Sequence, residues 1–223
     1  MSVVSQNMRI LVTGANGFLG RHLVTHLTHS HRELLTPRRT ELNLLSAEST
    51  QRYLIEHKPE IVVHLAAACG GISENVAKPA AFLRDNTLMG LNLLEASRVA
   101  GTNRFVLIST TCAYPQDAPI PLQEDSLWLG KPTSATGPYG LAKRFLHEAV
   151  EQYENQYGLD GRILIPANLY GPGDHYGSRS HVVAALIERY VDAARRKTSS
   201  VTNWGDGSAT REFMYVSDAA SAI

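Results

Sequence analysis

Short runs of apolar and β-branched residues alternate with longer segments of helical period along most of the chain. This alternation is typical of an α/β fold with a parallel sheet whose strands are joined by crossover helices. Strands are predicted at Met8–Thr13, Glu33–Thr36, Ile61–Ala66, Arg104–Ser109 and Gly161–Pro166. Helices are predicted between them at Phe18–Ser30, Ala47–His57, Pro79–Ala100 and Pro138–Tyr157.

The pattern changes after Pro166. A Gly-, Pro- and Asn-rich passage, NLYGPGDHYGSRS, precedes a predicted helix at His181–Arg196 and two short predicted strands near Val201–Asn203 and Glu212–Val216. We expect this part of the chain to begin a smaller region laid over the sheet.

The last residues, VSDAASAI, predict the start of another helix with Ser217 or Asp218 at its N-cap. Only a turn or so follows, without a stop signal and with little to bury. We therefore expect the chain to end before its fold does, so that the smaller region is truncated.

Composition and charge narrow the range of partners. The chain has 223 residues, 43% of them hydrophobic, which is enough to bury a substantial core. Its 21 basic and 21 acidic residues balance, and no Lys/Arg block suggests a nucleic-acid groove or an acidic membrane surface. No apolar run is long enough to span a membrane, and the start MSVVSQNMRI lacks the features of a secretory signal, so we expect a cytoplasmic protein.

Cysteine and histidine usage indicates neither a disulfide nor a metal site. Cys69 and Cys112 are interpreted as free thiols, because a reducing compartment disfavours pairing. Four histidines crowd one segment, but no cysteine or carboxylate stands at a ligand spacing from them, so a solvated helix face is favoured over a metal centre. These histidines are His22, His26, His29 and His31.

The first predicted strand runs directly into GANGFLG and then into a helix. Gly14 suits the tight turn, Gly17 permits the backbone to approach a pyrophosphate, and Gly20 permits close packing of helix and strand. At the first strand-to-helix turn of an alternating chain, this loop predicts dinucleotide binding rather than a plain turn. The predicted cofactor contacts in the loop are Gly14, Asn16, Gly17, Phe18, Leu19 and Gly20.

Two further segments bear on the cofactor. The acid expected near the end of the second strand is missing, and Arg38 and Arg39 stand there instead; arginine suits a 2′-phosphate and favours NADP(H) over NAD, with solvated loop arginines as the alternative. A second contact is predicted at Leu65, Ala66 and Ala67, where small residues at a strand end let the cofactor lie close. Plain helix-to-sheet packing is the alternative there.

The segment PYGLAK opens a predicted helix and puts Tyr139 and Lys143 on one face. A nearby ammonium and a positive nicotinamide would favour the phenolate, so we expect the pKa of Tyr139 to be lowered from about 10 toward neutrality. Tyr139 would then exchange a proton with a carbonyl oxygen as hydride is transferred. Thr110, at the end of the fourth predicted strand, can hydrogen-bond the same oxygen.

The glycine loop, the Ser/Thr strand end and the YxxxK pair together resemble the extended short-chain dehydrogenase/reductase superfamily. The resemblance implies that residues 1–167 form an NADP-binding Rossmann domain with a doubly wound parallel sheet. It also implies that residues 168–223 are the start of a substrate-binding region for a nucleotide sugar, mixed with returning Rossmann elements and lacking its C-terminal part.

Within that superfamily, further segments are similar to the GDP-L-fucose synthases, the GDP-4-keto-6-deoxy-mannose 3,5-epimerase/4-reductases. The segments are GANGFLG, ELNLL, HLAAACGGI, STTCAYP, GPYGLAK, PANLYGP, SHVVAALI and WGDGSATREF. The resemblance implies that Cys112 and His181 are the acid/base pair that inverts C3 and C5. It also implies that Thr110, Tyr139 and Lys143 carry out reduction at C4 with NADPH.

The same resemblance assigns binding roles. Asn168 would lie near both nicotinamide and sugar, and Arg189, Trp204 and Arg211 would contact the nucleotide diphosphate, for which arginine can bind two oxygens at once. For these four residues, packing or surface charge is the alternative. The long helices at 79–100 and 138–157 would form a homodimeric four-helix bundle, as in related enzymes.

Alternatives remain at this level. Thr110 replaces the serine expected from the family, and Asn16 stands where some members carry arginine, so the NADP preference depends mainly on Arg39. A paralogue acting on a GDP-linked keto-heptose or dideoxy-hexose, or an epimerase only, would need the same Cys112 and His181. An NAD-retaining UDP-sugar 4-epimerase and a non-catalytic dinucleotide sensor are less favoured, the sensor because Tyr139 and Lys143 are both present.

Overall fold

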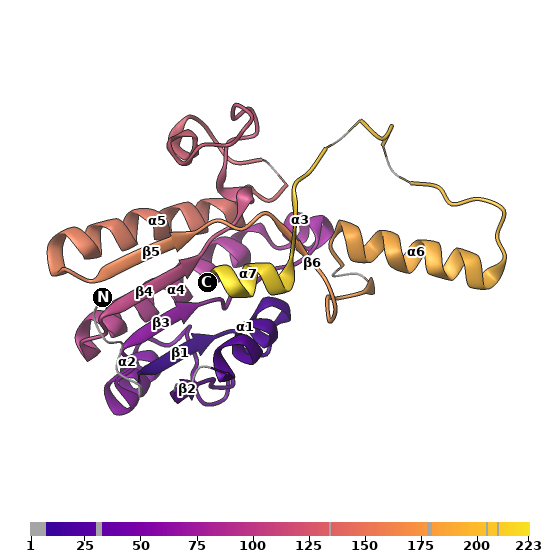
Figure 1. The fold of residues 1–223 in the computed structure, drawn as a ribbon. Coiled ribbons are helices and arrows are strands. Elements are labelled where there is room, and N and C mark those ends of the chain that lie inside the picture. The colour runs from indigo at the N-terminus through magenta and orange to yellow at the C-terminus, as the bar shows by residue number, and fades with distance from the viewer. Residues whose placement is uncertain (1–7, 30–32, 134, 178–179, 204, 209) are drawn as a thin grey trace.

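At the centre of the molecule lies a five-stranded sheet with the order β2-β1-β3-β4-β5, in which every neighbouring pair is parallel (Figure 1). Its strands are β1 (Arg9–Thr13), β2 (Glu33–Leu35), β3 (Ile61–His64), β4 (Arg104–Ile108) and β5 (Asp160–Leu164). A second, two-stranded parallel sheet contains β6 (Asn168–Tyr170) and β7 (Phe213–Tyr215). This computed structural model describes residues 8–29, 33–133, 135–177, 180–203, 205–208 and 210–223.

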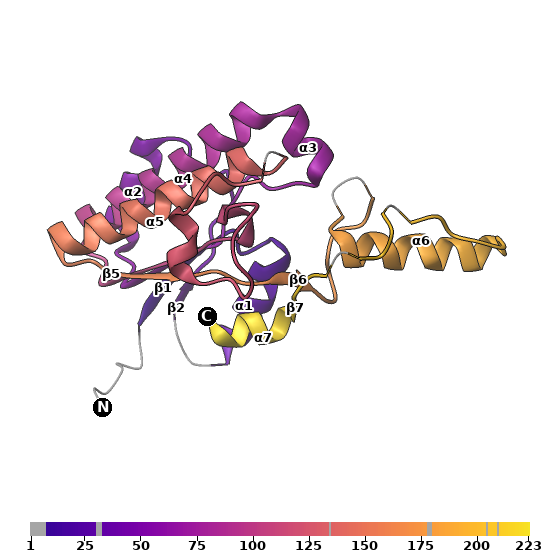
Figure 2. The ribbon, with the colours of Figure 1, turned by 90° about the horizontal axis from the view of Figure 1, so that it is seen from above.

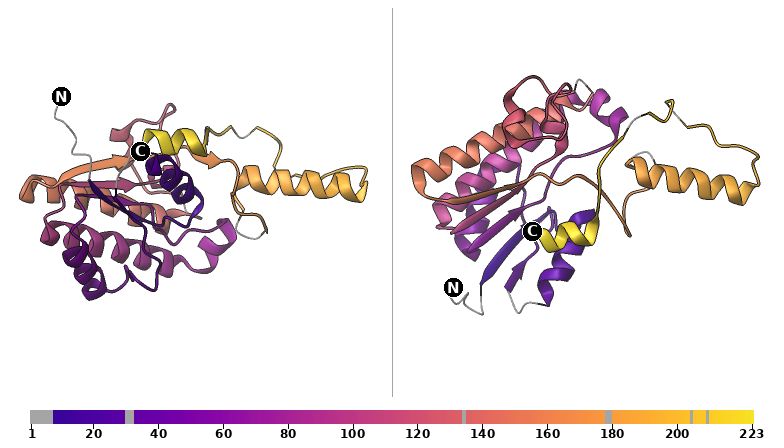
Figure 3. Two further views of the ribbon diagram at one scale, coloured as in Figure 1. Left: turned by 60° about the horizontal axis from the view of Figure 1, so that its bottom comes forward. Right: turned by 45° about the horizontal axis from the view of Figure 1, so that its top comes forward.

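Helices cover both faces of the large sheet, which makes it doubly wound. Helices α2, α4 and α5 pack in a row on one face, while α1 and α7 pack together on the other (Figures 1 and 3). The α-helices are α1 (Phe18–Thr28), α2 (Ala47–His57), α3 (Ile72–Ala77), α4 (Pro79–Ala100), α5 (Gly137–Tyr157), α6 (Val182–Arg196) and α7 (Val216–Ala222). Two short 3-10 helices are η1 (Thr111–Ala113) and η2 (Glu124–Trp128). The predicted Rossmann-type α/β fold is confirmed.

Alternation along β1 shows why the sheet needs two covering layers. Leu11 contributes to the cluster beneath α2, α4 and α5, whereas Ile10 and Val12 contribute to the cluster beneath α1 and α7. All three side chains are buried. A parallel strand whose two faces are both buried appears in the sequence as a continuous apolar run, and the ILV at the centre of RILVT is such a run.

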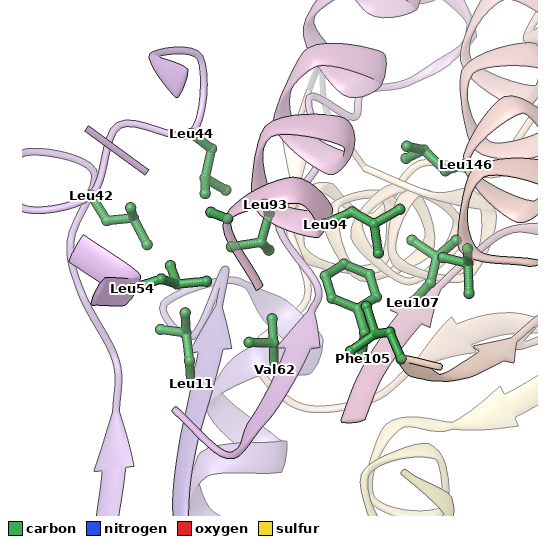
Figure 4. Close-up of a cluster of buried hydrophobic side chains, with 13 residues drawn as sticks. Leu11, Leu42, Leu44, Leu54, Val62, Leu93, Leu94, Phe105, Leu107 and Leu146 are labelled. Atoms are coloured by element: carbon green, nitrogen blue, oxygen red, sulfur yellow. The ribbon is translucent and has the colours of Figure 1, made fainter. Parts of the chain in front are cut away.

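The larger cluster joins the sheet to its three-helix layer (Figure 4). Leu54 of α2 and Leu93 of α4 have no exposed surface, and they pack with Leu107 of β4 in the same cluster. Full burial of each such side chain contributes about 1.5–3 kcal/mol relative to leaving it exposed. This cluster therefore fixes the helices whose N-terminal ends face the site described below.

Local signals set several helix ends. Ser46 caps α2 by accepting a hydrogen bond from the Ser49 backbone N–H, and Pro79 begins α4. Both long helices end at a glycine in the left-handed region, Gly101 after α4 and Gly158 after α5. Accordingly, the predicted C-terminal ends of these two helices are confirmed.

The second region differs from prediction in three places. The predicted strand near Val201–Asn203 is wrong; these residues form no ladder, and the Thr202 carbonyl and the Asn203 side chain accept hydrogen bonds from Arg189 instead. The strand that pairs with β7 is β6, which sequence analysis did not predict.

The last helix begins at Val216 with Tyr215 at its N-cap, so the expected caps Ser217 and Asp218 lie inside its first turn. The helix starts earlier because β7 leads into it without a loop. Val216, Ala219 and Ala220 are buried, and α7 packs on α1. Helix α7 thus packs against the large sheet's α1 layer, while β7 just before it belongs to the small sheet.

Helix α6 extends away from the sheet, and the end at which it begins is nearer the sheet than the end at which it stops (Figures 1 and 2). Its first helical residue is Val182, and His181 is its N-cap. Within the described ranges, no helix has the length and apolar character needed to cross a membrane.

Replacing Leu93 by Ala should lower the free energy of unfolding by about 2–5 kcal/mol, because the lost methyl groups leave a cavity between α4 and the sheet. Urea denaturation followed by circular dichroism measures this. Val99, on the same helix but 38% exposed, provides the matched control, and Val99→Ala should cost far less. Equal costs for the two variants would contradict the packing described here.

Candidate active site

The turn between β1 and α1 has the close geometry that its glycines predict. Gly14 has a φ of +72°, and a Cβ there would lie 2.7 Å from the Ala66 nitrogen. A Cβ on Gly20 would lie 2.2 Å from the Gly14 carbonyl oxygen. Gly17 is the N-cap of α1 and offers no side-chain cap, so the first N–H groups of α1 are left for another acceptor.

The ends of β1 and β3 are joined behind this turn by a buried polar pair. Thr13 Oγ1 lies 2.9 Å from Nδ1 of His64 and accepts a hydrogen bond from the Ala66 backbone N–H. Burial, and then the charge of Lys143, holds the pKa of His64 well below its usual value, so this imidazole is neutral. The segment containing Leu65, Ala66 and Ala67 is thereby held against Gly14.

The other predicted cofactor residues are all at least partly exposed. Asn16 is exposed, Phe18 and Leu19 are half-buried at the start of α1, and Arg39 is exposed in the loop after β2. Their roles in cofactor binding remain predictions.

At the end of β4 the chain turns sharply and presents two of the predicted catalytic residues. Thr110 is the N-cap of η1, and its Oγ1 accepts a hydrogen bond from the Cys112 backbone N–H at 3.2 Å. Because this bond uses the oxygen as acceptor, the hydroxyl proton of Thr110 remains available to a substrate oxygen. Cys112 is a half-buried free thiol.

Helix α5 closes on this turn from the side. A Cβ on Gly140 would lie 2.0 Å from the Cys112 carbonyl oxygen, so only glycine permits this approach. Lys143 is 2% exposed, and its Nζ donates a 2.8 Å hydrogen bond to the Ile108 carbonyl at the end of β4. Burial lowers the pKa of Lys143 to about 8, close to the range in which a lysine can exchange protons.

The pKa of Tyr139 departs from expectation. Burial raises it above its ordinary value of 10, and the thiols of Cys69 and Cys112 raise it further. The lowering toward neutrality that the sequence predicts is therefore not produced by the protein groups, because burial of the phenol disfavours the phenolate. The same couplings show that both thiols lie in the electrostatic surroundings of the phenol.

Sequence analysis missed a buried Ser–His pair next to these residues. His147 Nε2 lies 2.5 Å from Oγ of Ser109, and both residues are buried. Ser109 directly precedes Thr110, and His147 is four residues after Lys143, so the YxxxK spacing extended by one turn would have indicated it.

It also missed two asparagines that clamp the Cys69 loop. The side-chain amide of Asn86 makes two hydrogen bonds of 2.9 Å, one with each backbone group of Ala68. Nδ2 of Asn75 donates to the carbonyls of Gly70 and Gly71. Asparagines at otherwise buried helix positions are the signal that could have revealed this loop support.

Among the predicted substrate residues of the second region that the structure describes, none is hydrogen-bonded to Cys112. His181 is exposed at the start of α6, and within the described residues no hydrogen bond joins it to Cys112. Asn168, in β6, donates to the Glu212 carbonyl, and Arg189 and Arg211 both donate to nearby backbone carbonyls. Trp204 lies outside the described residues.

The histidine-rich segment shows no ligand cluster. His22 lies 2.9 Å from the Pro172 carbonyl oxygen, while His26 and His29 are exposed. His31 lies outside the described residues. Among residues that the structure describes, no group of three or more His, Cys, Asp or Glu side chains is arranged to hold a metal ion.

The doubly wound sheet, the glycine turn and the Thr–Tyr–Lys set at the end of β4 define a short-chain dehydrogenase/reductase of the extended type. Residues 10–223 match the NAD dependent epimerase/dehydratase family. The chain belongs to that family.

Two relatives and one solved structure show which members of the family this chain is similar to. The chain is 36% identical over 220 residues to a GDP-L-colitose synthase from Yersinia pseudotuberculosis, covering 97% of this chain and 71% of that protein. It is 34% identical over 221 residues to a GDP-L-fucose synthase from Azorhizobium caulinodans, covering 99% and 71%. A GDP-mannoheptose C4 reductase from Campylobacter jejuni, solved with NADP bound, has a TM-score of 0.89 at 27% identity, covering 99% and 72%. The resemblance to the GDP-L-fucose synthases is confirmed.

Lys143 should make stability depend on pH. Its pKa is about 8 in the folded chain against an ordinary 10.5, so the unfolded chain binds more protons between these values and the free energy of unfolding rises with pH across this window. The rise should be about 3 kcal/mol, and Lys143→Met should remove it. Denaturant titrations at several pH values measure the difference, with the exposed Lys131→Met as control. An unchanged pH slope in Lys143→Met would contradict the burial argument.

Proposed function

We propose that this chain is an NADPH-dependent epimerase and reductase that converts GDP-4-keto-6-deoxy-mannose to GDP-L-fucose. The observation that carries the proposal is the meeting of Cys112, Thr110, Tyr139 and Lys143 at the end of β4, where a keto sugar can contact a thiol and a phenol together. GDP-sugar names among its relatives support the substrate class.

NADPH held at the glycine turn would supply the hydride for reduction at C4 of the sugar. Tyr139 gives its proton to the ketone oxygen, so the carbonyl becomes an alcohol. A raised phenol pKa suits this direction, because the neutral acid is the form that donates. The free hydroxyl proton of Thr110 orients the same oxygen, and Lys143 stabilises the phenolate that remains.

In the epimerisation, the 4-ketone acidifies C3 and C5. One member of the Cys112 and His181 pair takes a proton from one face of the ring, and the other returns a proton to the opposite face, so no net proton is gained or lost. His181 begins α6 at the end nearer the sheet, which supports a role at the site (Figure 1). Residues 168–223, the proposed start of the substrate-binding region, would supply the other side of the sugar site.

The residues present fit NADP(H). The close turn of Gly14 and Gly20 leaves room only for backbone, and the uncapped start of α1 suits a pyrophosphate. Exposed Arg39 suits a 2′-phosphate, and no acidic residue competes for it between Leu35 and Arg39. Asn168 is proposed at the nicotinamide and sugar, with Arg189, Trp204 and Arg211 toward the diphosphate.

A dideoxy-hexose is the second candidate substrate, favoured by the 36% identity to a GDP-L-colitose synthase. The chemistry of the thiol and phenol is the same for both sugars.

Two free thiols also fit a reducing compartment, so we propose that the protein works in the cytoplasm.

Tyr139→Phe should lower NADPH oxidation with GDP-4-keto-6-deoxy-mannose by about 10²- to 10⁴-fold while deuterium uptake from solvent at C3 and C5 continues. Cys112→Ser should instead suppress deuterium uptake. Absorbance of reduced nicotinamide and NMR of the sugar give the two readouts for the intact protein, with Tyr157→Phe, on an exposed turn of α5, as the matched control.

Each outcome separates one reading from another. If a GDP-4-keto sugar of the dideoxy or heptose series is turned over with a higher kcat/KM than GDP-4-keto-6-deoxy-mannose, that sugar is the substrate. Deuterium uptake without cofactor oxidation would indicate an epimerase only. Neither signal with any GDP-keto sugar would rule the proposal out.

We also propose that two copies pair through α4 and α5. These helices leave an apolar hollow lined by Leu83, Arg84, Thr87, Leu88, Leu141 and Phe145. Leu141 and Phe145, both in the first half of α5, are each 46% exposed although their side chains are apolar. The same patch on a second copy would cover it with matching apolar surface and build a four-helix bundle with two-fold symmetry.

The double variant Leu88→Glu/Phe145→Glu should be monomeric, because four like charges would meet at the two-fold axis. Analytical ultracentrifugation measures the mass, and circular dichroism checks that the fold is kept. Ile55→Glu, on the exposed side of α2 and 46% exposed itself, should leave the dimer intact. A monomeric wild-type protein would overturn this part of the proposal.

A further inference from the structure

Helix α5 holds the end of β4 at successive points. Tyr139, Lys143 and His147 are spaced by four residues and therefore share one face of the helix. From that face, Lys143 reaches the carbonyl of Ile108 and His147 reaches the hydroxyl of Ser109. The next residue is Thr110.

The Ser109–His147 pair is well shielded. The exposed fractions of the two residues are 5% and 7%. Burial, followed by the positive charges of Lys143 and Arg144, lowers the pKa of His147 to about 4, so its imidazole is neutral near pH 7. The hydrogen bond between this neutral imidazole and the Ser109 hydroxyl fixes the orientation of the two side chains, and it adds no charge beside Lys143.

Ser109 is fixed on both sides. Its backbone N–H donates to the Leu164 carbonyl of β5 at 2.8 Å, while its side chain is held by α5 through His147. This double hold determines how the chain leaves β4, and so where the Thr110 hydroxyl lies relative to α5. The Thr110 oxygen is already used by the Cys112 N–H, which leaves its proton as the free group.

Stability alone does not account for such a pair. Replacing both members of a buried hydrogen bond by apolar groups of similar shape is nearly neutral or even stabilising. A polar pair next to the site is therefore better explained by the geometry that it imposes.

We propose that His147 is a positioning residue for the reduction step, which through Ser109 sets the Thr110 hydroxyl in line with the phenol of Tyr139. This inference rests on the proposed function. Neither residue touches the substrate in this scheme; both act through Thr110, and a small displacement of a reacting group can cost about 10²-fold in rate.

The test compares the double variant Ser109→Ala/His147→Leu with His147→Gln, whose amide can reach Ser109 as the imidazole does. Ser97→Ala, which removes another fully buried hydroxyl on α4, is the matched control. Measurements are kcat and KM for the keto sugar with NADPH, the dissociation constant of NADPH by fluorescence, and the midpoint of thermal unfolding.

The double variant should unfold at or above the wild-type temperature and bind NADPH normally, yet lose about tenfold or more in kcat with little change in KM. His147→Gln should recover most of that loss. A kcat within twofold of wild type in the double variant would overturn the proposal, as would a loss of kcat that His147→Gln fails to recover. The comparison of variants requires an active wild-type protein. If the wild type shows no turnover, the proposed function fails and the role of His147 is not at issue.

Discussion

The site depends on one buried interaction, the hydrogen bond from Lys143 Nζ to the Ile108 carbonyl. A lysine that is 2% exposed costs free energy to bury, and its pKa falls accordingly. The contact ties the first turns of α5 to the end of β4, so Tyr139 and Thr110 meet beside the same thiol. The close approach at Gly140 and the packing of the large core cluster make that arrangement possible.

Burial of Lys143 is unfavourable, and the histidines around it bury no further charge beside it. Neutral histidines at positions 64 and 147 flank the lysine, and both have pKa values lowered by burial, to which the lysine's own charge adds. A second charge beside Lys143 is thereby avoided. Asparagine clamps on the β3 loop hold Cys69 near the phenol in the same way that η1 holds Cys112. Polar contacts of this kind specify geometry more than they add stability.

Much of the fold could be predicted because its signals are local. The apolar runs of β1 and β4, the glycine turn after Thr13 and the glycines that end α4 and α5 each act within a few residues. Strand β6 and the absence of a strand at 201–203 could not be predicted, since β6 pairs with β7 more than forty positions away along the chain. Helix α7 begins before the predicted caps Ser217 and Asp218, because β7 leads directly into it. The position of β7 in turn depends on its pairing with β6.

By itself, the sequence determined the class of fold, the glycine turn and the residue types of the site, because hydrophobic period, glycine spacing and the YxxxK interval are properties of neighbouring positions. Only the tertiary structure decided the rest: that Ser109 meets His147, that Cys69 lies near Tyr139, and that the phenol's pKa rises instead of falling. Each of these depends on how deeply a side chain is buried and on which distant group is beside it. Burial and long-range contact come from the packing of the whole chain, so no short segment encodes them.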